Sequence, residues 1–383
     1  MILTLCTACA APLPDEPMQC AECATRYCSE RCERYDRRRG GHGRICGAIA
    51  SGGGAEQYHA DKKYAEAVDV AVEECAEDAE GQTCYICTEA LHAETKEGLV
   101  RGCACRGTAG FAHVSCLAEQ AKILVAEGEE NNLGLSALND RWARWDTCSL
   151  CKQMYYGVVY CALGWACWKT YVGRPETDRY RRTAMGVLGN GLEFAERNDE
   201  ALPIKEAELS MERRLGASED SILVVQGNLA NTYAKAGRSE DAVCTSRDVY
   251  LGHLKLYGEE NEKTLRATNN YASILVDLRH FKEAQSLMRK TIPVARRVLE
   301  ESNETTLRMR WTYAMALFFE DSTATLDDLS EAVTTLEDIE QIARRVFGGA
   351  HPTTSAIEEN LQDARAVLHA REETPSPGNA SSS

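Results

Sequence analysis

The sequence lacks a long apolar run, an N-terminal leader pattern and an excess of positive charge. An apolar segment at Tyr155–Trp168 holds 14 residues without a charge, whereas a membrane-spanning helix needs about 20. The first residues, MILTLCTACAAP, place no basic residue ahead of their apolar stretch, so a signal peptide is not expected. We therefore expect a soluble protein of the cytoplasm or nucleus. No membrane span is expected, because the apolar segment is too short, and Tyr155–Trp168 is predicted to form a buried helix.

Positive charge is scarce along the chain. The 43 lysines and arginines stand against 59 acidic residues, which gives a formal net charge of −16 and a pI near 5.1. A general nucleic-acid binder needs a basic face that displaces counterions, so this function is not expected. A local exception is the segment 31–44, which contains six arginines. Its simplest interpretation is a solvated surface.

Cysteine, in contrast, is abundant and falls into regular pairs. Fourteen of the 18 cysteines join two histidines in two successive frames of eight residues. The first frame is Cys6, Cys9, Cys20, Cys23, Cys28, Cys32, His42 and Cys46, and the second is Cys84, Cys87, Cys103, Cys105, His113, Cys116, Cys148 and Cys151. Each frame supplies the ligands of two tetrahedral Zn²⁺ ions, so four ions are expected. No position is left open for water, which indicates structural zinc.

Four cysteines lie outside the frames: Cys75, Cys161, Cys167 and Cys244. Because the others have zinc spacings rather than a disulfide framework, a reducing compartment is the better prediction. We expect the four remaining cysteines to be small buried hydrophobes. No catalytic nucleophile is evident, since thiolates bound to zinc are chemically committed.

Beyond the second frame the pattern is helical and contains a repeat of about 42 residues. The step Asn228-Leu229-Ala230 returns as Asn270-Tyr271-Ala272 and as Thr312-Tyr313-Ala314. A second alanine repeats at Ala242, Ala284 and, past an insertion around 321–327, Ala332. Small residues at fixed intervals let antiparallel helices approach closely, so the pattern predicts an α-solenoid.

These patterns divide the chain into five predicted parts. Residues 1–46 form the first zinc module, and 47–83 contain a Gly-rich joint followed by a connecting helix over Tyr58–Glu80. Residues 84–151 form the second zinc module. Residues 152–372 form the helical repeat array with a cap helix near 364–370, and 373–383 form a disordered tail.

The first frame resembles a MYND zinc finger over residues 6–46, with all eight ligands in order and a Tyr27-Cys28-Ser29 step. The resemblance implies a cross-braced arrangement and binding of short proline-containing peptides. Glu33 replaces the family's usual Gln after the sixth ligand, and the usual Trp before the His is missing. The implied zinc ligands are Cys6, Cys9, Cys28 and Cys32 for one ion, and Cys20, Cys23, His42 and Cys46 for the other.

The second frame resembles a RING-CH finger (RINGv, MARCH-type), on the segments CYIC, CACRGTAGFAHVSCL and CSLC. In such fingers the apolar residue inside the first pair grips a ubiquitin-conjugating enzyme (E2), which here implies an E2 contact for Ile86. The implied zinc ligands are Cys84, Cys87, His113 and Cys116 for one ion, and Cys103, Cys105, Cys148 and Cys151 for the other.

The second frame departs from the RING-CH pattern at two places. The gap between Cys116 and Cys148 holds 31 residues, and Gln120 stands where the family's E2-gripping Trp is usual. Trp142 or Trp145, just before Cys148, is a candidate replacement for that Trp. A PHD finger has the same ligand order and tolerates the long gap, but it prefers Cys-x2-Cys where this chain has Cys-x-Cys, so RING-CH is favoured.

The helical repeat resembles the tetratricopeptide (TPR) arrays of kinesin light chains over about 180–370. The phrase Gly349-Ala350-His351-Pro352-Thr353-Thr354 matches their inter-repeat signature, in which we expect His351 to be a turn residue. Together the resemblances predict the fold class as two small cross-braced zinc-finger modules followed by an all-α TPR-like solenoid.

Two functions follow from these resemblances, and whether the chain is an enzyme stays open at this stage. One is a RING-type E3 ubiquitin ligase without a covalent catalytic cysteine, which positions an E2 while the TPR and MYND modules recruit protein substrates. The other is a non-catalytic interaction scaffold, which Gln120 favours, or a PHD/MYND-like chromatin adaptor, which the acidic charge disfavours. The expected partners are an E2 and protein or peptide ligands of the TPR groove and the MYND finger.

Overall fold

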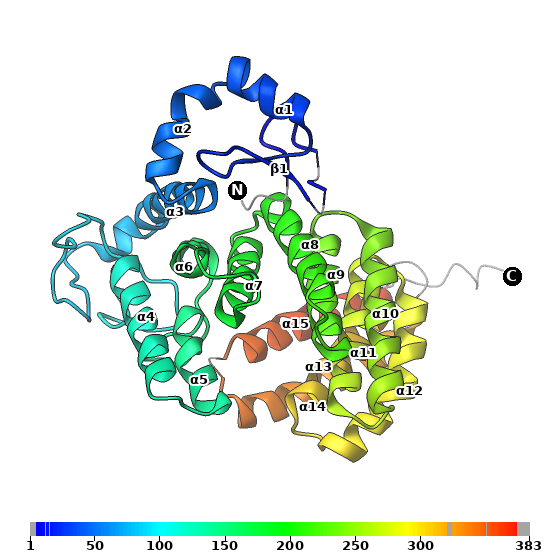
Figure 1. The fold of residues 1–383 in the computed structure, drawn as a ribbon. Helices are drawn as coiled ribbons and strands as arrows, with labels where there is room; N and C mark the ends of the chain where they lie inside the picture. Colours follow the sequence, from blue (N-terminus) through cyan, green and yellow to red (C-terminus); the bar gives the residue numbers. More distant parts are fainter. Residues whose placement is uncertain (1–4, 12, 15, 320–323, 350, 374–383) are drawn as a thin grey trace, which may run out of the picture. The chain divides into compact units, whose positions relative to one another are not determined.

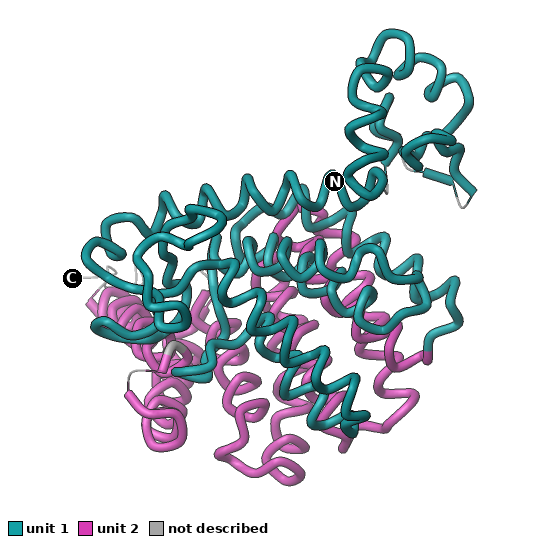
Figure 2. Tube along the Cα trace, turned by 60° about the vertical axis from the view of Figure 1, so that its left-hand side comes forward, with its two compact units in different colours: residues 1–217 teal, residues 218–383 magenta. Residues whose placement is uncertain are grey.

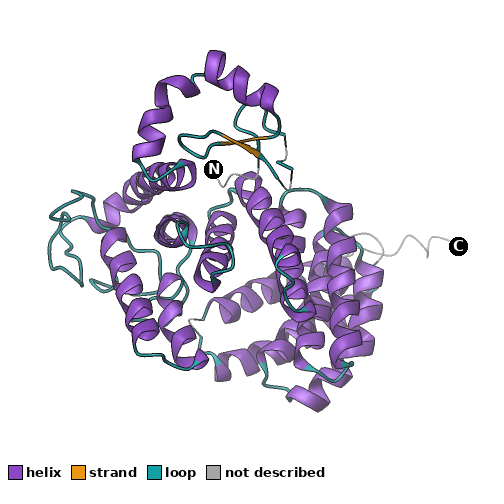
Figure 3. Ribbon diagram, in the orientation of Figure 1, coloured by secondary structure: helices purple, strands orange, loops and turns teal. Residues whose placement is uncertain are grey.

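The computed structural model describes residues 5–11, 13–14, 16–319, 324–349 and 351–373. The described chain is mainly helical, with long loops in the zinc modules and one two-stranded sheet (Figures 1 and 3). It divides into two compact units, Met1–Ala217 (unit 1) and Ser218–Ser383 (unit 2), which Figure 2 colours separately. The predicted tail from residue 374 onward and part of the predicted insertion, 320–323, lie outside the described residues.

Unit 1 contains the sheet, the residues of both zinc frames and helices α1 to α8. Strands β1 (Met18–Gln19) and β2 (Arg26–Tyr27) pair antiparallel, with Met18 opposite Tyr27. The helical elements are α1 (Glu30–Tyr35), the π-helix η1 (Asp36–Gly40), α2 (His42–Ser51), α3 (Ala55–Ala79), α4 (Val114–Glu130), α5 (Leu135–Trp142), the 3-10 helix η2 (Ala143–Trp145), α6 (Gly157–Tyr171), α7 (Arg179–Phe194) and α8 (Asn198–Arg214).

Helix α6 is the centre of unit 1. Every residue from Val159 to Trp168 is buried, so the apolar segment forms the buried helix that its length predicts. The helix packs against α3, α4 and α7. Close approach to α7 depends on glycine, because a Cβ at Gly191 would lie 2.7 Å from the Tyr160 carbonyl oxygen. Among the described residues, no helix combines the length and the apolar character needed to cross a membrane.

Unit 2 is a stack of antiparallel helices with a TPR-like repeat. Each helix packs against the next one along the chain, and α11 also packs against α13, as does α13 against α15. The repeated alanines lie fully buried at these helix contacts, at Ala230, Ala242, Ala272, Ala284, Ala314 and Ala332. The helices are α9 (Glu219–Lys235), α10 (Ser239–Tyr257), α11 (Glu262–Asp277), α12 (Phe281–Leu299), α13 (Glu304–Phe318), α14 (Leu326–Val346) and α15 (Pro352–Glu373).

One turn between repeats of unit 2 places a residue other than glycine in a strained backbone conformation. Gly258 ends α10 at φ 79° and ψ 175°, a conformation suited to glycine. One repeat later Glu300 ends α12 at φ 73° and ψ 165°, in a region that is nearly glycine-only. The fold therefore holds a glutamate in a glycine conformation. At the next inter-repeat turn, His351 accepts a hydrogen bond from the Thr353 backbone N–H at 3.2 Å, which agrees with its predicted turn role.

The cysteines outside the frames only partly follow the prediction. Cys161 and Cys167 are buried in α6, and burial raises the pKa of Cys161 to about 11 and that of Cys167 well above its usual value. Cys75 is only half-buried. Cys244 is exposed, so the prediction of a buried residue is wrong there. Its helix α10 buries Ala242, Ser246 and Val249 instead, and Cys244 lies off that face.

The domain division stays a prediction. The compact units group α6, α7 and α8 with the zinc-ligand segments, whereas the sequence pattern groups these helices with the later repeats. The connecting helix α3 begins after Gly53 and Gly54, both at positive φ, so the Gly-rich joint does precede a helix.

Candidate metal centres

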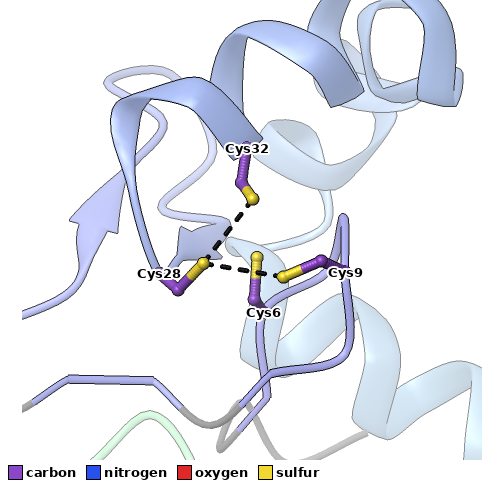
Figure 4. Close-up of side chains that lie close together, drawn as sticks. All are labelled: Cys6, Cys9, Cys28 and Cys32. Atoms are coloured by element: carbon purple, nitrogen blue, oxygen red, sulfur yellow. Dashed lines mark hydrogen bonds between the residues drawn. The ribbon is translucent and has the colours of Figure 1, made fainter.

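The first ligand group lies where the N-terminal loop meets the start of α1. The thiols of Cys6, Cys9, Cys28 and Cys32 point toward one another (Figure 4). The Cys28 sulfur is 3.6 Å from the Cys9 sulfur and 3.5 Å from the Cys32 sulfur. The Ser29 side chain caps α1 by accepting from the Cys32 N–H, so a local helix start fixes the spacing of the last two thiols.

The second group is fully buried and lies on α2. His42 and Cys46 are four residues apart on one face of this helix and meet Cys20 and Cys23. The His42 Nε2 atom is 3.4 Å from the Cys20 sulfur and 3.6 Å from the Cys23 sulfur. The Cys20 and Cys46 sulfurs are 3.7 Å apart. The ring of Tyr27 meets the His42 ring edge-on, which helps to hold the imidazole in place.

The third group contains Cys84, Cys87, His113 and Cys116. His113 is the residue before α4, and its Nδ1 atom lies 3.3 Å from the Cys87 sulfur and 3.6 Å from the Cys116 sulfur. The other ring nitrogen, Nε2, lies 3.4 Å from the Ala90 carbonyl oxygen. A proton on Nε2 can therefore be donated to Ala90, which leaves Nδ1 as the metal-binding nitrogen.

The fourth group joins Cys103 and Cys105 to Cys148 and Cys151. The Cys105 and Cys148 sulfurs are 3.8 Å apart although 43 residues separate them in the chain. Gly110 packs against this group at φ 87°, and a Cβ there would lie 2.6 Å from the Cys105 Cβ. Glycine at this position is required both by the backbone conformation and by the space beside the thiols.

These distances fit tetrahedral zinc. Zn–S bonds of about 2.3 Å and Zn–N bonds of about 2.05 Å place two sulfurs roughly 3.8 Å apart and a sulfur and a nitrogen roughly 3.5 Å apart. A disulfide would need sulfurs at about 2.05 Å, and all 18 cysteines are free. In each group the ligand atoms lie within 4.8 Å of one another, so the four groups are consistent with four zinc sites.

Contacts among the ligand thiols shift their pKa values in both directions. Although burial acts the other way, hydrogen bonds lower the pKa values of Cys6 and Cys20 to about 6. The Cys32 and Cys9 thiols beside Cys28 raise its pKa to about 12, and burial raises the pKa of Cys105 to about 11. Without a cation such thiols hold their protons at neutral pH. A divalent ion reverses this preference because it stabilises neighbouring thiolates.

In both modules the first and third ligand pairs share one site, and the second and fourth pairs share the other. This order is the cross-braced arrangement of the predicted fold class. The ligand pairs of the two sites alternate along the chain, so each site is made of two pairs with a pair of the other site between them. Each module therefore closes around its metal sites as a whole.

The long gap in the second module is filled by helices. The segment after Cys116 continues α4, forms α5 and η2, and returns to Cys148. Trp145 is fully buried, so its indole does not take the place of the usual E2-gripping Trp. Trp142 is half-buried, with its ring tilted against those of Tyr171 and Tyr180, and its predicted role stays a prediction. Both are used to pack the inserted segment into the core of unit 1.

Two loops of the second module lie together at its surface. Ile86, between the first ligand pair, is half-buried, and Leu150, between the last pair, is 48 % exposed. The Tyr85 phenol and the Ser149 hydroxyl are 3.1 Å apart, so a hydrogen bond joins these loops. Gln120 is half-buried on α4. Nothing in the ligand spacing could have shown the link between Tyr85 and Ser149.

Comparison with known proteins supports this picture of the second module. The family RINGv, described as a RING-variant domain, matches residues 84–132. The match contains six of the eight ligands and ends before Cys148, and it favours RING-CH over the PHD interpretation. No curated protein matches the chain.

Solved structures of TPR-like proteins resemble the chain at low identity. Two crystal structures of a putative kinesin light chain from Podosopora anserina, with nearly identical TPR-like repeats, are each 18% identical and cover 61% of this chain and 97% of that chain, with TM-scores of 0.40 and 0.39. BtubC (BKLC) from P. vanneervenii is 12% identical and covers 70% of this chain and 95% of that chain, with a TM-score of 0.36. The TPR-like repeat of this chain is shown by the packing of its own helices and by their buried alanines.

Proposed function

We propose that this chain is a RING-CH-type E3 ubiquitin ligase that positions an E2 on its second zinc module. The observation that carries the proposal is the RING-variant match at 84–132, to which the fold adds the distant pair Cys148 and Cys151. A RING holds the E2 so that its ubiquitin thioester faces attack, which is catalysis by positioning. Zinc, when bound, supplies only the folding energy of this platform.

The E2 contact is assigned to Ile86, with Leu150 on the loop that is hydrogen-bonded to its own. The hydrogen bond between Tyr85 and Ser149 holds the two loops at a fixed separation. One apolar side chain on each loop then offers the E2 a contact at a fixed spacing.

The proposal requires no nucleophile on the chain, because a RING orders the E2 thioester for direct attack. Fourteen cysteines belong to the ligand groups, and burial raises the pKa values of Cys75, Cys161 and Cys167. The remaining cysteine, Cys244, is an exposed thiol on α10 of unit 2, outside the second zinc module. Ubiquitin would therefore pass from the E2 to a substrate without a covalent intermediate on this protein.

Recruitment of protein substrates is assigned to the other modules. The TPR-like solenoid of unit 2 offers the extended surface that stacked helix pairs provide, and residues 6–46 are proposed to be a MYND-type finger. These assignments make protein or peptide segments, rather than nucleic acid, the expected ligands.

The test is ubiquitin transfer by the zinc-loaded chain with a panel of E2 enzymes. We expect autoubiquitination that is abolished by Ile86→Asp. Leu135→Asp is the matched control, because Leu135 is 68 % exposed on α5 and should tolerate the charge. Retained activity in Ile86→Asp, with unchanged zinc content, would contradict the assigned E2 contact.

A second candidate is a non-catalytic scaffold, and a specific observation favours it. Gln120 stands at the position of the usual E2-gripping Trp, and Trp145 is too deeply buried to take over its role. Absence of transfer with every E2, from a chain that binds about four zinc ions, would make the scaffold the better proposal.

A further inference from the structure

The first zinc module carries exposed positive charge that the proposed function does not use. All six arginines of the segment 31–44 are exposed. Two have acidic partners: Arg34 pairs with Glu30, and Arg37 with Glu22 and Glu33. For the other four, no carboxylate of the described chain lies within ion-pair distance. We call these four the arginine surface: Arg31, Arg38, Arg39 and Arg44.

Three acidic residues in or directly before this segment do not neutralise the arginine surface. Glu30 and Glu33 are engaged by Arg34 and Arg37. The third, Asp36, is only 6 % exposed and accepts a hydrogen bond from Tyr27. Thiolates bound to zinc also carry negative charge, and the thiols of Cys20 and Cys46 act on Arg37, which is already paired with Glu22. The arginine surface therefore keeps its charge for a ligand from outside.

The turn that carries two of these arginines, Arg38 and Arg39, is held from beneath by buried contacts. The Tyr27 hydroxyl, on a fully buried side chain, donates to the Asp36 carboxylate at 3.0 Å. A Cβ at Gly40 would lie 2.1 Å from the Asp36 Oδ1 atom, so the π-helix η1 closes tightly over this carboxylate. Single-turn π-helices occur often at functional sites. Because the turn is already ordered by these contacts, binding of a ligand would cost little conformational entropy of the turn.

The spacing of the arginines puts part of the surface on one side of the helix. Arg31, Arg34 and Arg38 follow one another at i, i+3 and i+7 along α1 and η1. Tyr35 is 55 % exposed on the same helix and Ile45 is 44 % exposed on α2. The module thus presents unpaired guanidinium groups together with exposed apolar side chains, the combination that recognises carboxylate-bearing peptides.

We propose that the arginine surface binds a short acidic peptide segment of a partner protein. The charge of the whole chain, −16, decides between this ligand and nucleic acid. A duplex carries one charge per about 1.7 Å and would bring many phosphates against an acidic protein. A short peptide keeps its carboxylates within a Debye length, about 8 Å, of the arginines. The inference holds whether or not the second module transfers ubiquitin.

The test is binding of a short fluorescein-labelled peptide of alternating Asp and Glu to the full zinc-loaded chain, measured by fluorescence anisotropy. A peptide of alternating Asn and Gln serves as the neutral probe. The variant is Arg31→Glu with Arg38→Glu, two unpaired arginines on one side of the helix. The matched control is Arg213→Glu with Arg345→Glu, which makes the same charge change at exposed arginines elsewhere.

We expect the acidic peptide to bind in a salt-dependent way, and the Arg31/Arg38 variant to bind about tenfold or more weakly. The control variant should bind as the unaltered chain does. Equal loss in both variants, or no binding of the acidic peptide, would overturn the proposal. So would tighter binding of a labelled DNA or RNA oligonucleotide with the same dependence on Arg31 and Arg38. If charge reversal lowers the zinc content, Arg31→Gln with Arg38→Gln replaces it, and unchanged binding would again refute the proposal.

Discussion

Tyr85 and Ser149 lie 3.1 Å apart across the second zinc module, and their hydrogen bond joins its first ligand pair to its last. Burial raises the pKa of Tyr85, so the phenol keeps its proton and remains able to donate. We expect Tyr85→Phe to lower the free energy of unfolding by about 0.5–1.5 kcal/mol, because one hydrogen bond is lost. Ubiquitin transfer should fall several-fold while zinc content stays unchanged. Tyr35→Phe, at an exposed position, is the control for both measurements.

Metal binding at the fourth site should depend on a residue that the family match does not contain. Cys148→Ser removes one of four thiols from this site, and we expect metal analysis to find about three zinc ions per chain instead of four. Cys244→Ser should retain all of them, since Cys244 is exposed and outside the four groups. Four ions in Cys148→Ser would place the fourth site elsewhere.

The glutamate at the end of α12 offers a stabilising substitution. Glu300 has φ 73° and ψ 165°, which costs a residue with a Cβ about 1–3 kcal/mol. Glu300→Gly should therefore raise the free energy of unfolding of unit 2 by about 1 kcal/mol, after the added flexibility of the unfolded chain is subtracted. Glu259→Gly, at the residue directly after Gly258 and outside the positive-φ positions, should give no gain. Urea unfolding compares the two, and equal effects would rule out backbone strain.

Glu208 on α8 should make stability depend on pH. Burial raises its pKa to about 7, with Glu212 adding to the effect and Lys205 opposing it. The folded state then binds this proton more strongly than the unfolded state, so its contribution is present at low pH and is lost as pH rises from about 4.5 to 7. Glu208→Gln should remove this loss. Zinc release at low pH lowers stability and so acts in the opposite direction. It should affect the unaltered chain and Glu208→Gln alike, so the difference between their free energies of unfolding in urea isolates Glu208. Exposed Glu219→Gln should leave the profile unchanged.

Local spacing explains what the sequence could predict. A short turn joins the two residues of a pair such as Cys84 and Cys87, so that both can bind the same metal ion. Their spacing in the sequence is therefore enough to predict their role. The helix contacts of unit 2 could also be predicted from the sequence, because alanines such as Ala272 and Ala314 recur at a fixed interval where two helices meet.

Contacts between distant segments explain what the sequence could not predict. The Ala90 carbonyl that orients His113 and the Tyr27 hydroxyl that holds Asp36 have no spacing rule of their own. Trp145 is a further case, because an indole beside a ligand pair can face solvent or core. Its burial depends on how the inserted helices fold back. The close packing at Gly110 could have been predicted from the sequence, since a glycine between ligands often marks a tight backbone approach.

The burial of Trp145 also has a consequence for the intrinsic tryptophan fluorescence of this protein. Trp145, Trp165 and Trp168 share the core of unit 1 with the ligands Cys103 and Cys148, and Trp142 packs against them. Trp311 alone represents unit 2 among the five tryptophans. The ultraviolet emission of the chain is therefore mainly a signal from the zinc-bearing half, and chelation should be visible as a red shift without any added dye.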